Sequence, residues 1–186
     1  EWLAKRLQLV IDSADEGMYA IDTEARAFLF NESASRLLGF SVAEMIGNDL
    51  HGLIHHTKAD GTPYPLAECP IVQALRRGEG VHVTGDVFWR KDGTSFPVEY
   101  ASSPIIEEGQ VRGAVVSFTD ITARRAAEAE REEAIRLGIA LLEISSAINS
   151  TLDFDEIMQR VVVQAAKAIG CNTSSIEVRK QGYWEV

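Results

Sequence analysis

Three histidines and one cysteine are the residues of this chain whose types and spacing could do chemistry. His51, His55 and His56 lie close together, and Cys69 follows them. His51 and His55 are four positions apart, so on a helix they would share one face. Imidazole and thiolate ligands suit zinc, copper or iron. Two of the histidines with Cys69 could therefore bind such a metal, although their spacing matches no established ligand signature.

The same segment can also be a structural loop without a metal. In this alternative the imidazoles and Asp60 form hydrogen bonds that hold residues 59–65 in place, and Cys69 is a small buried apolar residue. A redox-active Cys69 is disfavoured because no resolving cysteine lies nearby. The sequence leaves the structural loop and the metal site open.

Composition and charge indicate an ordinary globular protein with one full domain and part of a second. The chain has 186 residues, of which 46% are hydrophobic and 25% are charged. Its net charge of -10 opposes non-specific binding to nucleic acid or anionic lipid, so we expect neither partner. No apolar run approaches the roughly 20 residues of a membrane helix, and the start lacks the apolar core of a signal peptide. The two cysteines fall in different modules, which fits a reducing cytoplasm.

Short helices and a first hairpin must position the histidines. Strands are predicted over residues 18–22 and 28–31, followed by short helices over 32–38 and 41–47. Ser41 and Glu44 form a capping-box pattern at the start of the second helix. Cys69-Pro70 opens a helix over residues 71–77, because proline suits the first helical turn.

Three later strands complete the predicted sheet. Alternating apolar residues mark the third strand, at Val81, Val83, Val87 and Trp89. An Asp-Gly turn leads into the fourth strand, and residues 111–119 are apolar enough to form a central strand. Five strands with helices grouped between the second and third predict an α+β fold, with a five-stranded antiparallel sheet covered by helices on one face.

Residues 120–148 follow the sheet as one long helix with a heptad seam typical of a coiled coil. The seam consists of Ala123, Ala127, Glu130, Ala134, Leu137, Leu141, Ile144 and Ile148. Its alanine-rich half should pair weakly, whereas its last four residues should hold a homodimer. The amphipathic helix over residues 1–14 could either dimerise or cover the sheet, through Leu3, Leu7 and Val10.

Two stretches resemble known families. The runs DEGMYAIDTEARAFLFNESASRLLGFSVAEMIG, RKDGTSFPVEYASSPI and GAVVSFTDIT resemble a PAS sensor domain over residues 15–122. Their ending, Asp120-Ile121-Thr122, resembles the PAC-type signature, which implies a signal relay into a linker helix over residues 123–148. Residues 149–186 are similar to the N-terminal part of a GAF domain, which is truncated here.

The PAS resemblance implies a pocket between the sheet and the helices for a small organic ligand, or a packed core with no ligand. The candidate lining residues are Met18, Phe28, Leu38, Ile54, His55, Val72, Leu75, Phe88, Tyr100, Val116 and Phe118. The large apolar members could simply fill the core. The cysteine of the flavin subfamily and the axial histidine of the haem subfamily are missing at the matching places, so the cofactor is unknown.

These features predict a cytoplasmic sensory module of a bacterial signal-transduction protein, such as a sensor histidine kinase. Its PAS core would sense a small ligand or a partner and relay the signal through a dimeric linker to GAF and output domains of the parent chain. No phosphate loop or connector histidine is present, so we expect no enzymatic activity in this segment. The alternatives are a ligand-free assembly module and a metal or haem redox sensor that uses His51, His55, His56 and Cys69.

Overall fold

The computed structural model describes residues 2–151, 154–169, 178–180 and 183–185. The chain divides into two compact units, Glu1–Ala127 and Glu128–Val186. Within the described ranges, no helix combines the length and the apolar character needed to cross a bilayer.

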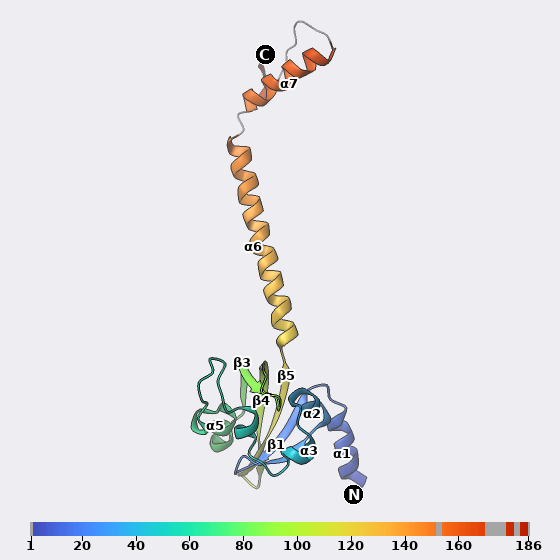
Figure 1. The fold of residues 1–186 in the computed structure, drawn as a ribbon, viewed down its shortest axis with the longest axis vertical. Coiled ribbons are helices and arrows are strands. Elements are labelled where there is room, and N and C mark those ends of the chain that lie inside the picture. The colour runs from blue at the N-terminus through green and yellow to red at the C-terminus, as the bar shows by residue number, and fades with distance from the viewer. Residues whose placement is uncertain (1, 152–153, 170–177, 181–182, 186) are drawn as a thin grey trace. The chain divides into compact units, whose positions relative to one another are not determined.

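The first unit is built on a five-stranded antiparallel sheet, as predicted (Figure 1). Its strand order is β2-β1-β5-β4-β3. The strands are β1 (Gly17–Asp22), β2 (Ala27–Phe30), β3 (Val81–Trp89), β4 (Ser95–Glu107) and β5 (Gln110–Asp120). The prediction that the last strand is central is confirmed, because β5 pairs with both β1 and β4.

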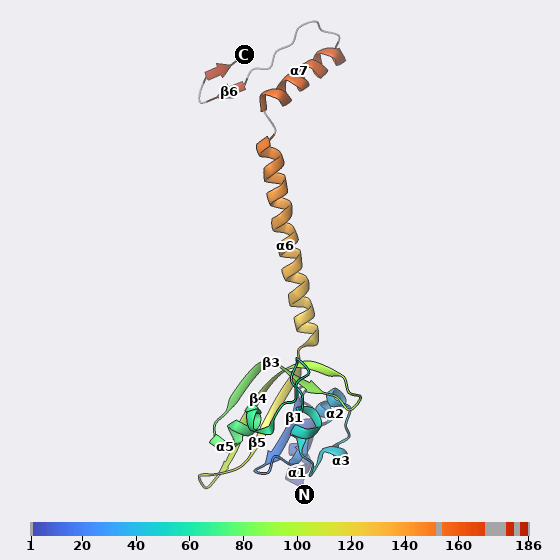
Figure 2. The ribbon, with the colours of Figure 1, turned by 60° about the vertical axis from the view of Figure 1, so that its left-hand side comes forward.

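Short helices between β2 and β3 cover one face of the sheet and complete the α+β fold (Figures 1 and 2). They are α2 (Glu32–Leu38), α3 (Val42–Met45), α4 (Leu50–Ile54), the 3-10 helix η1 (Leu66–Glu68) and α5 (Pro70–Arg77). The capping box at Ser41 and Glu44 and the proline in the first turn of α5 are present as predicted. The core lies between these helices and the inner face of the sheet.

Asn31 joins the N-terminal helix α1 (Trp2–Asp12) to the sheet. Its buried Oδ1 accepts hydrogen bonds from the backbone N–H groups of Ala34 and Met18, each at 2.8 Å. Its Nδ2 donates to the carbonyl oxygens of Ile11 and Glu16. One side chain therefore caps α2 and also fixes the segment between α1 and β1.

A β-bulge in β3 interrupts the alternation that was predicted for that strand. Gly85 has φ +89° and is the extra residue between Thr84, which pairs with Glu99, and Asp86, which pairs with Val98. One extra residue shifts the side-chain parity. Asp86 and Phe88 therefore lie on the inner face with Val83. Val87 and Trp89 lie on the opposite face, contrary to the prediction that they continue the stripe of Val81 and Val83.

A long helix follows the sheet, in agreement with the sequence, as α6 (Thr122–Thr151). The second unit also contains α7 (Phe154–Ile169) and a small hairpin of β6 (Val178–Lys180) and β7 (Tyr183–Glu185). Much of the predicted GAF start, including Asp153, Gly170, Cys171 and most of residues 173–179, lies outside the described residues.

Close packing of β1 on β5 leaves no space for a side chain at Gly113. A Cβ there would lie 2.3 Å from the backbone oxygen of Ile21. We expect Gly113→Ala to lower the free energy of unfolding by about 1–3 kcal/mol, measured by urea denaturation. Gly80→Ala is the control, because its Cβ would lie at an ordinary 3.5 Å from the oxygen of Ser102. Equal loss of stability in the two variants would contradict this account.

Candidate functional site

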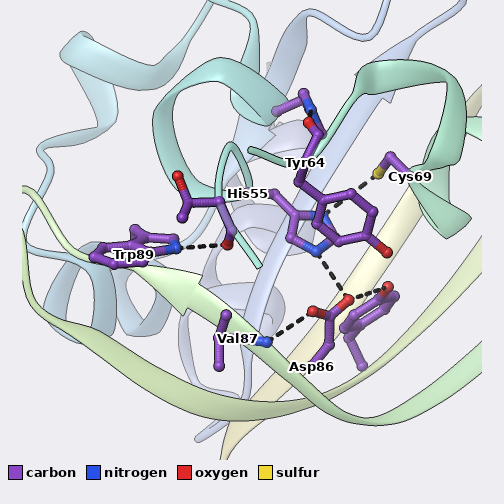
Figure 3. Close-up of polar contacts among 9 residues, drawn as sticks. His55, Tyr64, Cys69, Asp86, Val87 and Trp89 are labelled. Carbon is purple, nitrogen blue, oxygen red and sulfur yellow. Dashed lines mark hydrogen bonds and ion pairs between the residues drawn. The ribbon is translucent and has the colours of Figure 1, made fainter. Parts of the chain in front are cut away.

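Two histidines and a cysteine converge at the buried end of α4. Figure 3 shows two of them, His55 and Cys69. His51 lies in α4, His55 is its C-cap residue, and Cys69 is the N-cap residue of α5. One ligand atom from each of the three lies within 4.8 Å of the others, and Cys69 Sγ is 3.4 Å from His55 Nδ1. His55 is only 2% exposed and Cys69 only 1%, so the folding of the segment between β2 and β3 creates this cluster inside the domain.

Asp86 holds the other side of the His55 ring (Figure 3). His55 Nε2 lies 2.9 Å from Asp86 Oδ2, and the hydroxyl of Tyr100 donates to the same oxygen at 3.2 Å. The second oxygen of Asp86 accepts the backbone N–H of Val87 at 2.8 Å. The bulge at Gly85 makes this possible because it turns Asp86 to the inner face of β3.

His51 is oriented by the loop that follows α4. Its Nε2 lies 2.8 Å from the carbonyl oxygen of Tyr64. A carbonyl oxygen can only accept, so Nε2 carries the proton and Nδ1 carries the lone pair when the ring is neutral. His51 Nδ1 is buried and has no hydrogen-bond partner among the residues that the structure describes. The Tyr64 ring itself packs edge-on against His55, with ring centroids 4.7 Å apart.

The cluster shifts the protonation of its members. Burial raises the pKa of the Cys69 thiol, but the adjacent imidazoles of His51 and His55 lower it to about 6. Burial lowers the pKa of His55, whereas its contacts with Asp86 and Cys69 raise it to about 9. The pKa of Asp86 is also lowered, because the contact with His55 outweighs burial. At neutral pH the arrangement favours a buried thiolate beside an imidazolium.

The order cysteine, histidine, aspartate also occurs in enzymes that use a thiolate nucleophile, but the surroundings here differ. A nucleophile must reach its substrate, and Cys69 is buried beside a cavity of about 20 Å³. That volume is sufficient for a water or an ion and far below the roughly 300 Å³ of a typical ligand pocket. The geometry therefore favours ligation or ionic stabilisation over covalent catalysis.

The structure brings together three of the four residues of the predicted metal group and separates the fourth. His51, His55 and Cys69 form the cluster. His56 instead stacks on Trp89 with ring centroids 5.4 Å apart, and its Nδ1 contacts the hydroxyl of Thr57 at 2.6 Å. His56 is therefore not part of the cluster, because α4 ends at Ile54 and the chain turns His56 to solvent.

The predicted ligand-lining residues have different fates. Ile54, His55 and Val72 line the cavity. Most of the others are buried members of the core: Leu38, Leu75, Phe88, Tyr100, Val116 and Phe118. Met18 is partly buried. Phe28 is 53% exposed, and its assignment to the interior was wrong, because β2 is an edge strand whose register against β1 is irregular and turns this side chain outward.

Sequence reasoning missed the residues that orient the two imidazoles. Asp86 lies 31 positions from His55, and the Tyr64 carbonyl lies 13 positions from His51. The signal for Asp86 was a glycine inside an alternating strand, which is typical of a β-bulge and of a changed side-chain direction. No side-chain pattern marks a backbone carbonyl as a partner, so Tyr64 had no comparable signal.

Comparisons with known proteins place these features in context. The chain is 25% identical over 130 residues to the signal transduction histidine-protein kinase AtoS of Escherichia coli, covering 69% of this chain and 20% of that protein. It is 20% identical over 122 residues to the transcriptional activator RocR of Bacillus subtilis, covering 66% of this chain and 25% of that protein. The chain thus spans a quarter or less of the length of these two relatives.

Solved structures share the fold of the first unit. A PAS domain from Colwellia psychrerythraea matches with a TM-score of 0.53 and 20% identity, over 66% of this chain and 99% of that chain. An RNA-binding light-oxygen-voltage receptor matches with a TM-score of 0.57 and 22% identity, over 74% of this chain and 38% of that chain. The sequence profile of the PAS fold family matches residues 5–121. With this profile, strand order and helical cover, the chain belongs to the PAS fold family.

Proposed function

We propose that this chain is the sensory input segment of a bacterial signal-transduction protein, in which the PAS domain senses a small ligand or a partner and passes its state to α6. The observation that carries the proposal is the bonding of Asp120, the last residue of β5, to both α6 and the rest of the domain. A ligand that favours one arrangement of the sheet over another would thereby favour one arrangement of the start of α6.

The Asp120 carboxylate bonds in two directions. Its Oδ1 accepts the backbone N–H of Thr122 at 2.9 Å and the hydroxyl of the same residue, which caps the first turn of α6. Its Oδ2 pairs with Arg90 at 2.7 Å. Arg90 Nε also donates to the carbonyl oxygen of Leu37 at 2.9 Å. The start of α6 is therefore linked to the hairpin between β3 and β4 and to the end of α2.

Two further contacts join the sheet to the first turns of α6. Arg124 pairs with Glu99 of β4 at 2.5 Å. The guanidinium of Arg125 lies directly over Gly85, where an added Cβ would be 2.9 Å from it. Gly85 precedes Asp86, the partner of His55, so a displacement of this carboxylate has a short route to α6 through the bulge. This contiguity supports a path from the buried cluster to the helix.

A homodimer through α6 completes the proposed relay. Leu137, Leu141 and Ile144 are all more than half exposed on α6. Apolar side chains at heptad spacing are exposed to solvent in a single copy. A second copy that covers them would stabilise the helix pair. In α1, Val10 is exposed as well. The side chains of Leu3, Leu7 and Ile148, which complete the predicted contacts, lie outside the described residues.

The domain boundaries and the output are part of this proposal. The boundaries are an N-terminal helix at 1–14, the PAS domain at 15–122, a linker helix at 123–148 and a GAF start at 149–186. The likeness to an activator and to a histidine kinase supports a cytoplasmic signalling protein with an output domain elsewhere in its chain. The PAS fold itself is sensory, so enzymatic activity would belong to that output domain.

A double-mutant cycle in amide hydrogen exchange tests the relay. Asp86→Asn weakens the contact with His55 and so imitates the change in the core that a ligand would cause. We expect it to change exchange at residues 124–130 of α6 at least about threefold, and we expect Asp120→Ala to abolish that response because the junction is lost. The measurement is mass spectrometry of α6 peptides from the four proteins.

Asp60→Ala is a matched control for this cycle. Asp60 bonds to the N–H and hydroxyl of Thr62 just as Asp120 bonds to Thr122, but no ion pair links it to Arg90. The response of α6 should therefore survive in this background. If Asp86→Asn changed the exchange of α6 by the same factor in the wild-type protein and in Asp120→Ala, the proposed relay would be refuted.

The second candidate is a ligand-free dimerisation module. The observation in its favour is the filled core, in which the cavity of about 20 Å³ leaves no room for an organic molecule. Native mass spectrometry and thermal shifts with metals and metabolites distinguish the two functions. A dimer whose melting temperature responds to none of them favours assembly, whereas a specific shift favours sensing.

A further inference from the structure

Each imidazole of the cluster has its Nε2 atom held by an oxygen acceptor. His55 Nε2 faces the carboxylate of Asp86, and His51 Nε2 faces the carbonyl oxygen of Tyr64. Both acceptors require a proton on Nε2, which leaves Nδ1 of each ring as the possible ligand atom. His55 Nδ1 faces Cys69 Sγ at 3.4 Å. A metal-binding histidine typically has this arrangement, in which the other ring nitrogen donates to a carboxylate or a backbone carbonyl.

A network of hydrogen bonds alone explains only part of this geometry. It accounts for His55, whose Nδ1 contacts Cys69 Sγ at 3.4 Å. It does not account for His51 Nδ1, which is buried near Cys69 and makes no hydrogen bond of normal geometry to any residue that the structure describes. A buried nitrogen lone pair without a donor is unfavourable, and an ion held between His51, His55 and Cys69 would satisfy it.

The size and position of the cavity match an ion. The cavity of about 20 Å³ is bordered by all three residues and otherwise by mainly apolar side chains. Typical Zn–N distances of roughly 2.0–2.1 Å and a Zn–S distance of roughly 2.3 Å require ligand atoms about 3.3–3.8 Å apart. The pair of His55 and Cys69 already meets this at 3.4 Å, and the largest separation in the cluster is below 4.8 Å. Closure by about an ångström completes the site.

We propose that His51 Nδ1, His55 Nδ1 and Cys69 Sγ bind one zinc-type divalent metal ion, with a fourth position open to the cavity. Two imidazoles and one thiolate suit Zn²⁺, and three protein ligands leave one position for water or an exchangeable ligand. Asp86 and the Tyr64 carbonyl are positioning groups that fix the two rings. Metal binding displaces the proton between His55 and Cys69. The site does not depend on the proposed relay through Asp120.

Titration of the chelator-treated chain with Co²⁺ tests the site. Co²⁺ replaces Zn²⁺ in such sites and reports a bound thiolate by a charge-transfer band in the near ultraviolet. We expect one equivalent of Co²⁺ to produce this band and one equivalent of Zn²⁺ to remove it. Zn²⁺ in excess should also raise the melting temperature, because a ligand that binds the native state stabilises it. A stoichiometric complex without the thiolate band would overturn the proposal, and so would the absence of binding.

Matched variants assign the ligands. Cys69→Ser should abolish the band, whereas Cys171→Ser should keep it. His51→Asn should weaken Co²⁺ binding at least about 100-fold, and Asp86→Asn about 10–100-fold through the lost orientation of His55. His56→Asn is the control, because this neighbouring ring contacts Thr57 and Trp89 instead. Equal weakening in His51→Asn and His56→Asn would overturn the assignment. Circular dichroism shows whether each variant is folded. If Cys69→Ser does not fold, the His51→Asn variant provides the test, because His51 is only half-buried.

Discussion

Replacement of Phe88 by alanine is expected to lower the free energy of unfolding by about 3–5 kcal/mol. Phe88 is 0% exposed and packs closely against three rings: its centroid lies 5.4 Å from Tyr100, 5.3 Å from Phe118 and 5.1 Å from His55. The variant loses the buried apolar surface and leaves a cavity that these rigid rings cannot fill. Urea denaturation followed by tryptophan fluorescence measures the effect, which is a large part of the stability of a typical domain.

Phe28→Ala is the matched control for this prediction. It removes the same side chain from the same sheet, but Phe28 is 53% exposed on the edge strand β2. Its loss should change the free energy of unfolding by no more than about 0.5 kcal/mol. A loss below about 1 kcal/mol for Phe88→Ala, or equal losses for the two variants, would show that the aromatic cluster is not the centre of the core.

Leu141→Asp is expected to weaken homodimerisation at least about 100-fold, since it places a charge where an apolar contact between two copies should form. Leu141 is 67% exposed in α6, so the substitution removes little packing within one copy. The folded first unit should be unaffected. Sedimentation equilibrium over a range of protein concentrations gives the dissociation constant, and circular dichroism verifies the helix.

Ala127→Asp tests the predicted gradient along the same seam. Alanine contributes little apolar surface to a dimer, so a charge at this position should change the dissociation constant less than about tenfold. We expect it to alter signalling rather than assembly. Equal loss of the dimer in Ala127→Asp and Leu141→Asp would exclude a graded seam, and an unchanged dimer in both would exclude this face of α6 as the interface.

The parts of the fold that depend on local rules could be predicted from the sequence. Ser41 and Glu44 cap a helix through contacts three residues apart, and Pro70 begins α5 because its geometry suits the first turn. The central position of β5 could also be predicted from a local property. Its sequence is apolar, as is typical of a strand that has neighbours on both edges. These signals do not require knowledge of distant residues.

The candidate site was predictable only in its ligand types. His51 lies in α4 and His55 is the C-cap residue of the same helix, so their spacing of four positions brings them together. The contacts with Asp86 and with Tyr64 depend on how a loop and an edge strand meet in three dimensions, which periodicity does not specify. Phe28 was misplaced for a related reason, because an irregular register on β2 reversed the direction that simple alternation gives.

The bulge at Gly85 also determines which kinds of sequence change the site can tolerate. Since the bulge places Asp86 on the inner face and the turn over residues 90–94 fixes the register after it, the deletion of a single residue between Asp86 and this turn would reverse the parity of Asp86 and turn it away from His55. An insertion of one residue would have the same effect on the strand's parity. Point substitutions in β3 at positions other than Gly85 and Asp86 leave the strand length unchanged and so preserve the position of the carboxylate. Insertions and deletions in this strand should therefore eliminate the His55–Asp86 contact even where every chemical group is retained.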